Sequence, residues 1–437
     1  MAQLQPKQKE LIAAFASVCE VEGDNLLGPW SCPELQNIFH SIGRQSPWKN
    51  HLQDSDLLRI IFWLLYRTTR LLPTGYRGAV KDAPDGTQML AQFQNDLVQF
   101  LESIPRTYHA YFPLVGVPSL LTRDHQLTEL ISIIDTSIGD EQDAKLLEDA
   151  FPLANVVASM TGKPIPRLKR NQRYLRITTT GYADGSTSSP AAILVLAQLK
   201  QFLFFGLATG FLEELPTWRL GRFDNAMHDQ SVVIRNESLN EDEEYSLSLP
   251  DEFYRYLLRM VVSEKAREYF DMSTGKTLLG GTLRQANTPE EVASAIKGKL
   301  GGFGEFLDIP QDDSDAIRIR AACEWWIDAS ASQNQTISFL QYCIGFEALL
   351  GENTKDRGIT ERLSDRFAYL LGKTQSQRSE LRRRFRNVYE RRGLIVHQRE
   401  PHLRRFDSSA RIEAKQMLLQ AVVSEVNQLL KAKRQPA

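Results

Sequence analysis

Arg392 and His397, which are separated by Gly-Leu-Ile-Val, carry the two kinds of side chain that can cleave RNA without a metal ion. Cleavage by the ribose 2′-hydroxyl requires removal of the hydroxyl proton, protonation of the leaving 5′-oxygen and stabilisation of charge on phosphorus oxygens. An imidazole, with an ordinary pKa near ~6.5, can accept or donate these protons at neutral pH. A guanidinium stays cationic and holds phosphate oxygens with its planar fork. The pair therefore predicts chemistry on RNA.

The charge around this pair indicates an anionic partner. Residues 378–407 contain ten arginines and four acidic residues, a balance of 10 − 4 = +6, whereas the whole chain carries −2. Positive charge concentrated in one segment of a mildly acidic protein predicts a local anion-binding surface. Two interpretations remain open, contacts to RNA phosphate and an ordinary solvated helix face. The arginines concerned are Arg382, Arg383, Arg384 and Arg386.

Composition predicts a cytoplasmic globular protein without a metal or cofactor. The 437 residues are 42% hydrophobic and 24% charged, enough for two or three domains. The four cysteines are scattered without a CxxC pair, so neither a zinc cluster nor a disulfide framework is indicated. The first residues are too polar for a secretory signal. An apolar run over 191–211 is interrupted by Gln198, Lys200 and Gln201, which favours a core helix over a membrane span.

The first part of the chain, 1–160, is predicted to be a helical domain of unknown role. Apolar residues recur at helical spacing over 7–21, and Asp54-Ser-Asp56 can cap a helix over 57–72. The same pattern continues over 88–104, and Asp124 can cap a helix that extends through Ile134.

The middle of the chain, 161–305, is predicted to be a smaller α+β region. Residues 173–180 alternate and are rich in β-branched side chains, which is typical of a strand. Two further strands, 231–235 and 244–249, are predicted to pair with each other. Pro250-Asp251 is expected to start a helix that reaches about Ser263.

The last part, 312–435, is predicted to be an antiparallel bundle of helices. The segment 301–315, rich in glycine and acids, is expected to contain the main domain boundary. Short connections between the helices that follow favour antiparallel neighbours. The predicted helices are 316–329, 336–350, 360–371, 376–396 and 408–431.

This last part resembles a HEPN domain, in particular its Apea-like branch. The matching pieces, in order, are 322–329, 339–351, 359–371 and 388–397, the last of which contains Tyr-x-x-Arg-x4-His. The resemblance implies an antiparallel helical bundle that dimerises so that two such helices face one cleft. It also implies metal-independent RNA cleavage, with Arg392 and His397 as the catalytic pair and a 2′,3′-cyclic phosphate as the product.

Other residues near the motif have open interpretations. Arg391 also satisfies the looser Arg-x(4 to 6)-His spacing of the family. Tyr389 can stack on a base or pack in the core, and Glu347 can orient the catalytic arginine or form a plain ion pair. Gly393 follows the motif arginine, where many HEPN nucleases have a polar residue.

We therefore expect a mainly α protein that acts as a cytoplasmic RNA endonuclease in antiviral defence, a toxin–antitoxin system or a stress response. Its N-terminal region is expected to restrain it and to bind a trigger or a regulatory protein, by analogy at the level of the fold. The alternative is a non-catalytic HEPN module that scaffolds a protein or RNA assembly. One geometric difficulty is that five positions on a helix place Arg392 and His397 about 140° apart.

Overall fold

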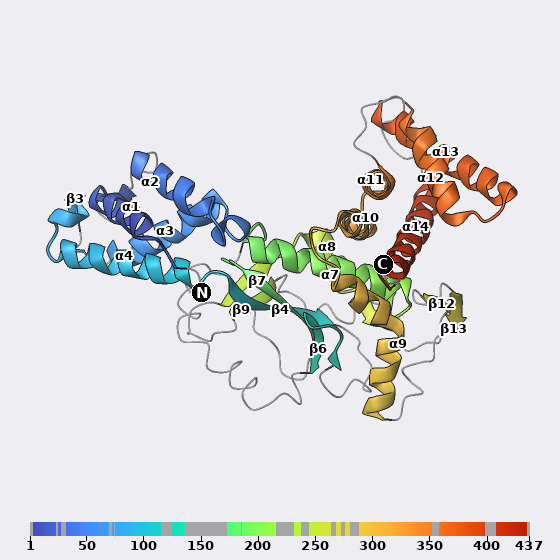
Figure 1. Ribbon diagram of the computed structural model, residues 1–437, viewed down its shortest axis with the longest axis horizontal. Coiled ribbons are helices and arrows are strands. Elements are labelled where there is room, and N and C mark those ends of the chain that lie inside the picture. The colour runs from blue at the N-terminus through green and yellow to red at the C-terminus, as the bar shows by residue number, and fades with distance from the viewer. Residues whose placement is uncertain are drawn as a thin grey trace. The chain divides into compact units, whose positions relative to one another are not determined.

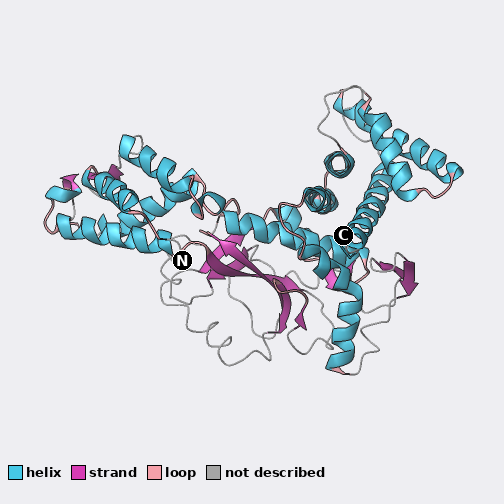
Figure 2. Ribbon diagram, in the orientation of Figure 1, coloured by secondary structure: helices cyan, strands magenta, loops and turns pink. Residues whose placement is uncertain are grey.

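The protein is mainly helical and contains several small sheets (Figure 2). The computed structural model describes residues 3–22, 25–27, 32–69, 72–73, 75–114, 125–135, 173–184, 186–215, 231–236, 244–263, 268–271, 276–279, 288–351, 358–397 and 408–434. The chain divides into two compact units. Unit 1 comprises Met1–His109, Thr178–Leu194 and Ile234–Leu247, and unit 2 comprises Ala110–Ile177, Val195–Val233 and Ser248–Ala437. The three-part division expected from the sequence stays a prediction.

The helices of unit 1 pack around one apolar core, and α1, α3 and α4 lie side by side (Figure 1). Phe15 of α1, Leu65 of α3 and Phe93 of α4 are fully buried in this core. The predicted helices over 7–21, 57–72 and 88–104 are confirmed, with shifted ends. The elements are α1 Pro6–Ser17, β1 Glu20–Glu22, β2 Asn25–Leu27, α2 Pro33–Ile38, η1 Phe39–Gly43, η2 Trp48–Asn50, α3 Asp54–Thr69, β3 Arg77–Ala79, η3 Val80–Asp82 and α4 Gly86–Glu102.

A six-stranded sheet has the strand order β10-β9-β4-β7-β6-β5. The strand predicted over 173–180 is confirmed as β7, and the two strands predicted over 231–235 and 244–249 are confirmed as neighbours. The strands are β4 Arg106–Leu114, β5 His125–Gln126, β6 Ile131–Asp135, β7 Arg173–Gly181, β9 Ser231–Asn236 and β10 Glu244–Ser248.

The helix expected from Asp124 through Ile134 is wrong, because these residues contribute β5 and β6. Strand β6 runs antiparallel to β7, with Ile133 opposite Leu175. The Ile-Ser-Ile-Ile run is rich in β-branched side chains, and Ile131 and Ile133 are buried. Pairing with a strand forty residues away in the sequence decided the structure, which a local capping signal could not reveal.

The helix expected to reach Ser263 ends earlier. Helix α8 (Asp251–Leu257) is followed by β11 (Met260–Val262), which pairs antiparallel with β8 (Leu212–Glu214). All three residues of β11 are buried. The residues that were expected to form the last turns of the helix therefore pair with β8 instead. A second small hairpin joins β12 (Glu268–Asp271) to β13 (Lys276–Leu279).

The apolar run forms α7 (Pro190–Ala208), and its second half is buried, with Phe202, Phe204 and Phe205 fully enclosed. Among the described residues, α7 is the one helix long and apolar enough to cross a membrane, and most of it is buried in the protein. Phe205 packs against Phe303 and Phe306, with ring centroids 4.9 Å and 5.4 Å away. The polar interruption at Lys200 has a partner within unit 2, because its Nζ lies 2.8 Å from Asp328 Oδ2.

All five helices predicted after residue 312 are confirmed. Side-chain caps start three of them, from Asp313, Asn334 and Thr374. The preceding helix, α9 (Pro289–Leu307), continues through Gly301, so the first half of the expected boundary segment is helical. The five helices are α10 Ser314–Ala331, α11 Gln335–Leu350, α12 Ile359–Leu371, α13 Gln375–Val396 and α14 Ser408–Arg434.

Arg320 of α10 is a buried cation that connects this helix to the end of α9. Its guanidinium donates to the carbonyl oxygens of Ile309 and Pro310, at 2.6 Å and 3.1 Å, and lies 5.3 Å from the centroid of Phe306. Burial lowers the pKa of this arginine. The contact to Ile309 gives a hydrogen-bond donor to the carbonyl group of a buried residue.

Glu324 makes stability depend on pH. Burial raises the pKa of this carboxyl, which accepts a hydrogen bond from Gln201 at 3.3 Å. Because the folded state binds the proton more tightly than the unfolded chain, the group's stabilising contribution is lost as pH rises through the raised pKa. We expect Glu324→Gln, which keeps the acceptor, to raise the melting temperature at pH 8 and to change it little at pH 4. The exposed Glu252→Gln is the control, and an equal effect of Glu324→Gln at both pH values would contradict the prediction.

Candidate nuclease site

Helix α13 carries both residues of the predicted catalytic pair. It begins with a capping box, in which the Thr374 hydroxyl and the Gln377 side chain each accept from the other's backbone N–H at 3.2 Å. It runs without interruption to Val396, and His397 caps it, donating its backbone N–H to the Gly393 carbonyl at 3.1 Å. Figure 1 shows α12 and α13 as a hairpin of two helices.

Aromatic packing fixes the rotation of α13 about its own axis. The buried ring of Phe385 lies 5.0 Å from Phe346 of α11 and 5.2 Å from Phe367 of α12, centroid to centroid. Tyr389, one turn later, stacks on Phe385 at 4.7 Å with an interplanar angle of 14°. With this face held inward, the positions of Arg392 and His397 follow from the helical repeat.

Tyr389 is part of the core. It is 5% exposed, and its hydroxyl donates to the carbonyl oxygen of Cys343 at 3.2 Å. Burial raises its pKa well above the ordinary value for tyrosine. Of the two interpretations left open by the sequence, packing fits this environment, because neither ring face is open to a base.

Glu347 of α11 holds Arg392 by an ion pair. Arg392 Nη2 lies 3.2 Å from Glu347 Oε1, and the two side chains are 31% and 29% exposed. A guanidinium has five N–H donors in a fixed fork, so one carboxylate contact leaves others for a phosphate. The pair can therefore orient the arginine toward an anion, although the same geometry also suits a plain structural ion pair.

The described residues include no hydrogen bond between Arg392 and His397. They are separated by about 7.5 Å along α13 and about 140° around it. Of the residues between Arg392 and His397, two lie inside this arc on the helix surface, Gly393 and Val396. Val396 is 45% exposed, and a methyl group added at Gly393 would meet no atom within 4 Å. The arc is therefore an open surface with little side-chain bulk, bounded by a cation and an imidazole.

Two of the predicted RNA-binding arginines have acidic partners on the α12–α13 hairpin. Arg382 forms an ion pair with Asp365 of α12, which raises the pKa of the arginine. Arg383 is bound by Glu380 one turn earlier, with 2.6 Å between Nη2 and Oε1. These contacts neutralise part of the charge that the sequence places on this helix, so a phosphate would have to compete for both guanidinium groups.

The remaining arginines of α13 differ in their surroundings. Arg384 Nε lies 2.7 Å from Glu413 of α14, and Arg391 is half-buried. Arg386 is exposed, and in the described part of the chain no ion pair is found for it. Arg386 is therefore the arginine of this group that is most available to an anion. The three later arginines of the basic stretch, Arg399, Arg404 and Arg405, lie outside the described residues.

Tyr369 is a candidate binding residue that the sequence did not indicate. It is 59% exposed on α12, and the guanidinium groups of Arg378 and Arg382 lie 4.4 Å and 5.4 Å from its ring centroid. An exposed aromatic ring beside two cations can stack on a nucleic-acid base. The cluster forms across the turn between two helices, and for that reason no spacing along the chain predicts it.

Groups of three or more histidine, cysteine, aspartate or glutamate side chains placed to hold a metal ion are not found in the described ranges. Comparison with known proteins gives no match, because no family model fits the sequence and neither a curated protein nor a solved structure is similar to it. The function is therefore inferred from the site itself.

Gly393 and Gly345 provide a matched pair of substitutions. Both lie inside helices, but a methyl group at Gly393 meets open space, whereas one at Gly345 would lie 2.5 Å from Leu418 Cδ2. We expect Gly393→Ala to raise the free energy of unfolding by about 0.5–1 kcal/mol, because alanine lowers the entropy of the unfolded chain. Gly345→Ala is expected to lower it by about 1–3 kcal/mol through overpacking. Urea titration measures both, and a destabilised Gly393→Ala would show that α13 is strained at this point.

Proposed function

We propose that the protein is a metal-independent RNA endonuclease of the HEPN type, with Arg392 and His397 as its catalytic residues. The observation that supports this most directly is the open arc on α13, which has an oriented guanidinium at one end and an exposed imidazole at the other. The fixed rotation of the helix places Arg392 beside Glu347 of α11, whereas His397 is exposed at the C-terminal end of α13.

The chemistry proposed for the pair is transesterification within the RNA. An unprotonated His397 imidazole accepts the proton of the 2′-hydroxyl as the 2′-oxygen attacks phosphorus. The bond from phosphorus to the 5′-oxygen breaks, and a protonated imidazole supplies the proton to this leaving group, which gives a 2′,3′-cyclic phosphate and a free 5′-hydroxyl. Arg392 stabilises the negative charge on the two non-bridging oxygens.

Two imidazoles are needed at once, and we infer that a second copy of the chain provides the other. The residues between Arg392 and His397 support this, because Leu394 and Ile395 are only half-buried and Val396 is exposed. Apolar residues that are partly or largely exposed at a helix end suit an interface. Two α13 ends packed together would place both histidines in one cleft, as the HEPN resemblance implies.

The biological setting is proposed by analogy with the family. Uncontrolled cleavage of cellular RNA would harm the host, so unit 1 is proposed to restrain the enzyme or to bind its trigger. Antiviral defence, a toxin–antitoxin system and a stress response, all in the cytoplasm, are the settings that the resemblance implies.

The alternative function is a non-catalytic HEPN scaffold. Gly393 favours it, because the polar side chain that many HEPN nucleases have after the arginine is missing. The ion pairs that neutralise part of the positive charge of α13 also favour it, because binding a protein partner requires less positive charge than binding RNA.

The cleavage test uses tRNA and a mixed single-stranded RNA in EDTA. We expect the wild type to cleave and both Arg392→Ala and His397→Ala to lose about 10²-fold to 10⁴-fold in rate, because each removes a proton-transfer or charge-stabilising group. Asn387→Ala is the control, since it removes an exposed polar side chain from the same helix that the site does not use. Cleavage unchanged in both site variants would refute the assignment. Absence of cleavage by every protein, with no toxicity in cells, would favour the scaffold.

The dimer test uses an exposed apolar residue at the end of α13. We expect the wild type to sediment as a dimer and Val396→Glu to sediment as a monomer, because a charge at a buried interface is costly. Ile412→Glu on α14, at an equally exposed isoleucine, is the control. Analytical ultracentrifugation measures the masses, and a Val396→Glu dimer as tight as the wild type would exclude this interface.

A further inference from the structure

Helix α3 in unit 1 has two stripes of side chains with the same spacing. The first stripe faces the core and is buried: Leu57, Ile60, Ile61, Leu64 and Leu65. The second lies on the outer side and is here named the α3 stripe: Arg59, Phe62, Trp63, Tyr66 and Arg67. A surface helix ordinarily has polar residues opposite its apolar face, and this one has three aromatic rings instead.

The rings of the α3 stripe are unusually accessible and lie in an ordered arrangement. Phe62, Trp63 and Tyr66 are 45%, 45% and 49% exposed. The rings of Phe62 and Tyr66 are nearly parallel, with 7° between their planes and 6.3 Å between their centroids. Trp63 leans on Phe100 of α4, whose ring has the Arg106 guanidinium 4.2 Å from its centroid. The stripe therefore presents flat aromatic rings to solvent, and Phe100 of α4 supports the ring of Trp63.

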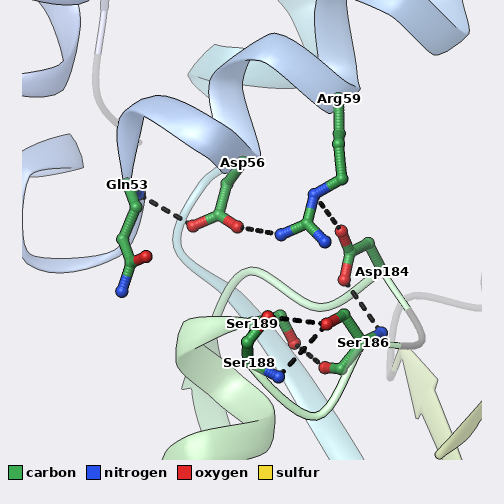
Figure 3. A network of polar contacts seen from close by, with 7 residues as sticks. All are labelled: Gln53, Asp56, Arg59, Asp184, Ser186, Ser188 and Ser189. Carbon is green, nitrogen blue, oxygen red and sulfur yellow. Dashed lines mark hydrogen bonds and ion pairs between the residues drawn. The ribbon is translucent and has the colours of Figure 1, made fainter.

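The carboxylates that pair with Arg59 are withdrawn from solvent. Arg59 contacts Asp56 Oδ1 at 2.5 Å and Asp184 Oδ2 at 2.9 Å, and its side chain is 41% exposed. The side chains of Asp56 and Asp184 are 0% and 14% exposed. Figure 3 shows this arginine between the two carboxylates, with Asp184 also bound by the backbone of Ser186. The cationic end of the network is thus the part that solvent reaches.

The same arrangement recurs at the other end of the α3 stripe. Arg67 lies 3.0 Å from Asp96 Oδ2, and the side chains are 45% and 15% exposed. Its guanidinium is also 5.3 Å from the centroid of the Trp63 ring. Three aromatic rings are therefore flanked along one helix by guanidinium groups whose counter-charges lie beneath them.

We propose that the α3 stripe binds single-stranded nucleic acid, with bases stacked on the rings and phosphates beside the guanidinium groups. Every base has a π face, and stacking on an aromatic side chain requires that the base be unpaired. The exposed guanidinium groups of Arg59 and Arg67 keep N–H donors for phosphate oxygens, and the side chains of the carboxylates that pair with them are 15% exposed or less. A lipid surface fits less well, because the aliphatic face of α3, which an interfacial helix would insert, is buried in the core of unit 1.

This site uses no residue of the proposed nuclease centre, so each proposal can fail without the other. If the nuclease proposal holds, the α3 stripe would recognise single-stranded RNA as substrate or as trigger. If the protein is a scaffold, the stripe would be a nucleic-acid site of that assembly.

The binding experiment uses full-length protein carrying His397→Ala, so that RNA is not cut. Fluorescein-labelled twelve-nucleotide oligo(U) and oligo(dT) are titrated in EDTA at low salt, and anisotropy reports binding. We expect both to bind, with Trp63→Ala and Tyr66→Ala each weakening the affinity at least about 5-fold, the effect of losing one stacked base. Trp63→Phe is expected to retain most of the affinity. Tighter binding of oligo(U) than of oligo(dT) would identify RNA as the ligand.

The matched controls test the position and the kind of site. Ile337→Ala, at a residue 49% exposed on α11, should leave the affinity unchanged, and melting curves verify that each variant folds. The double variant Arg67→Gln/Asp96→Asn is expected to reduce the slope of log affinity against log salt by about 0.7. The proposal is overturned if neither oligonucleotide binds, if a duplex binds equally well, or if Tyr369→Ala abolishes binding while Trp63→Ala does not. A protein partner would then be the better occupant.

Discussion

Aromatic packing between α11, α12 and α13 is the constraint on which the candidate site depends. One face of α13 is held against α11 and α12 by contacts among the rings of Phe346, Phe367, Phe385 and Tyr389. Because these contacts fix the rotation of the helix, they also fix the direction in which each of its other side chains points. Arg392 is further held by Glu347 on the neighbouring helix. The site is thus built on rigid helices, which favours precise placement of a charge over adaptability.

Charge is organised differently from what the sequence alone indicates. The ten arginines near the C-terminus read as a strongly positive surface, but in the fold Arg382, Arg383 and Arg384 each have a carboxylate partner. On α3, the exposed parts of the ion pairs are the guanidinium groups, because the side chains of Asp56 and Asp96 are buried more deeply than those of Arg59 and Arg67. Local pairing, and not the count of charges, determines what an anion meets.

Much of the helical structure was predictable from the sequence. The helices after residue 312 were found nearly to the residue, because three of them begin at a capping side chain such as Thr374 and their connections are short. The strands β6 and β11 were missed, since partners distant in the sequence decided them. In the site, the positions of Arg392 and His397 on one helix were predictable. Their separation by an open arc and the cluster at Tyr369 were not, because both depend on how helices pack.

The composition of unit 1 bears on how the chain can be divided. Its helices occupy the first 109 residues, yet the unit is completed only by Thr178–Leu194 and Ile234–Leu247. A fragment that stopped at His109 would lose Asp184, leaving Arg59 with one carboxylate, and would lose the Tyr182 ring that packs on Phe100. It would also end within β4 and present an unpaired strand edge, which is a site of aggregation. The N-terminal helices are therefore not a separable module.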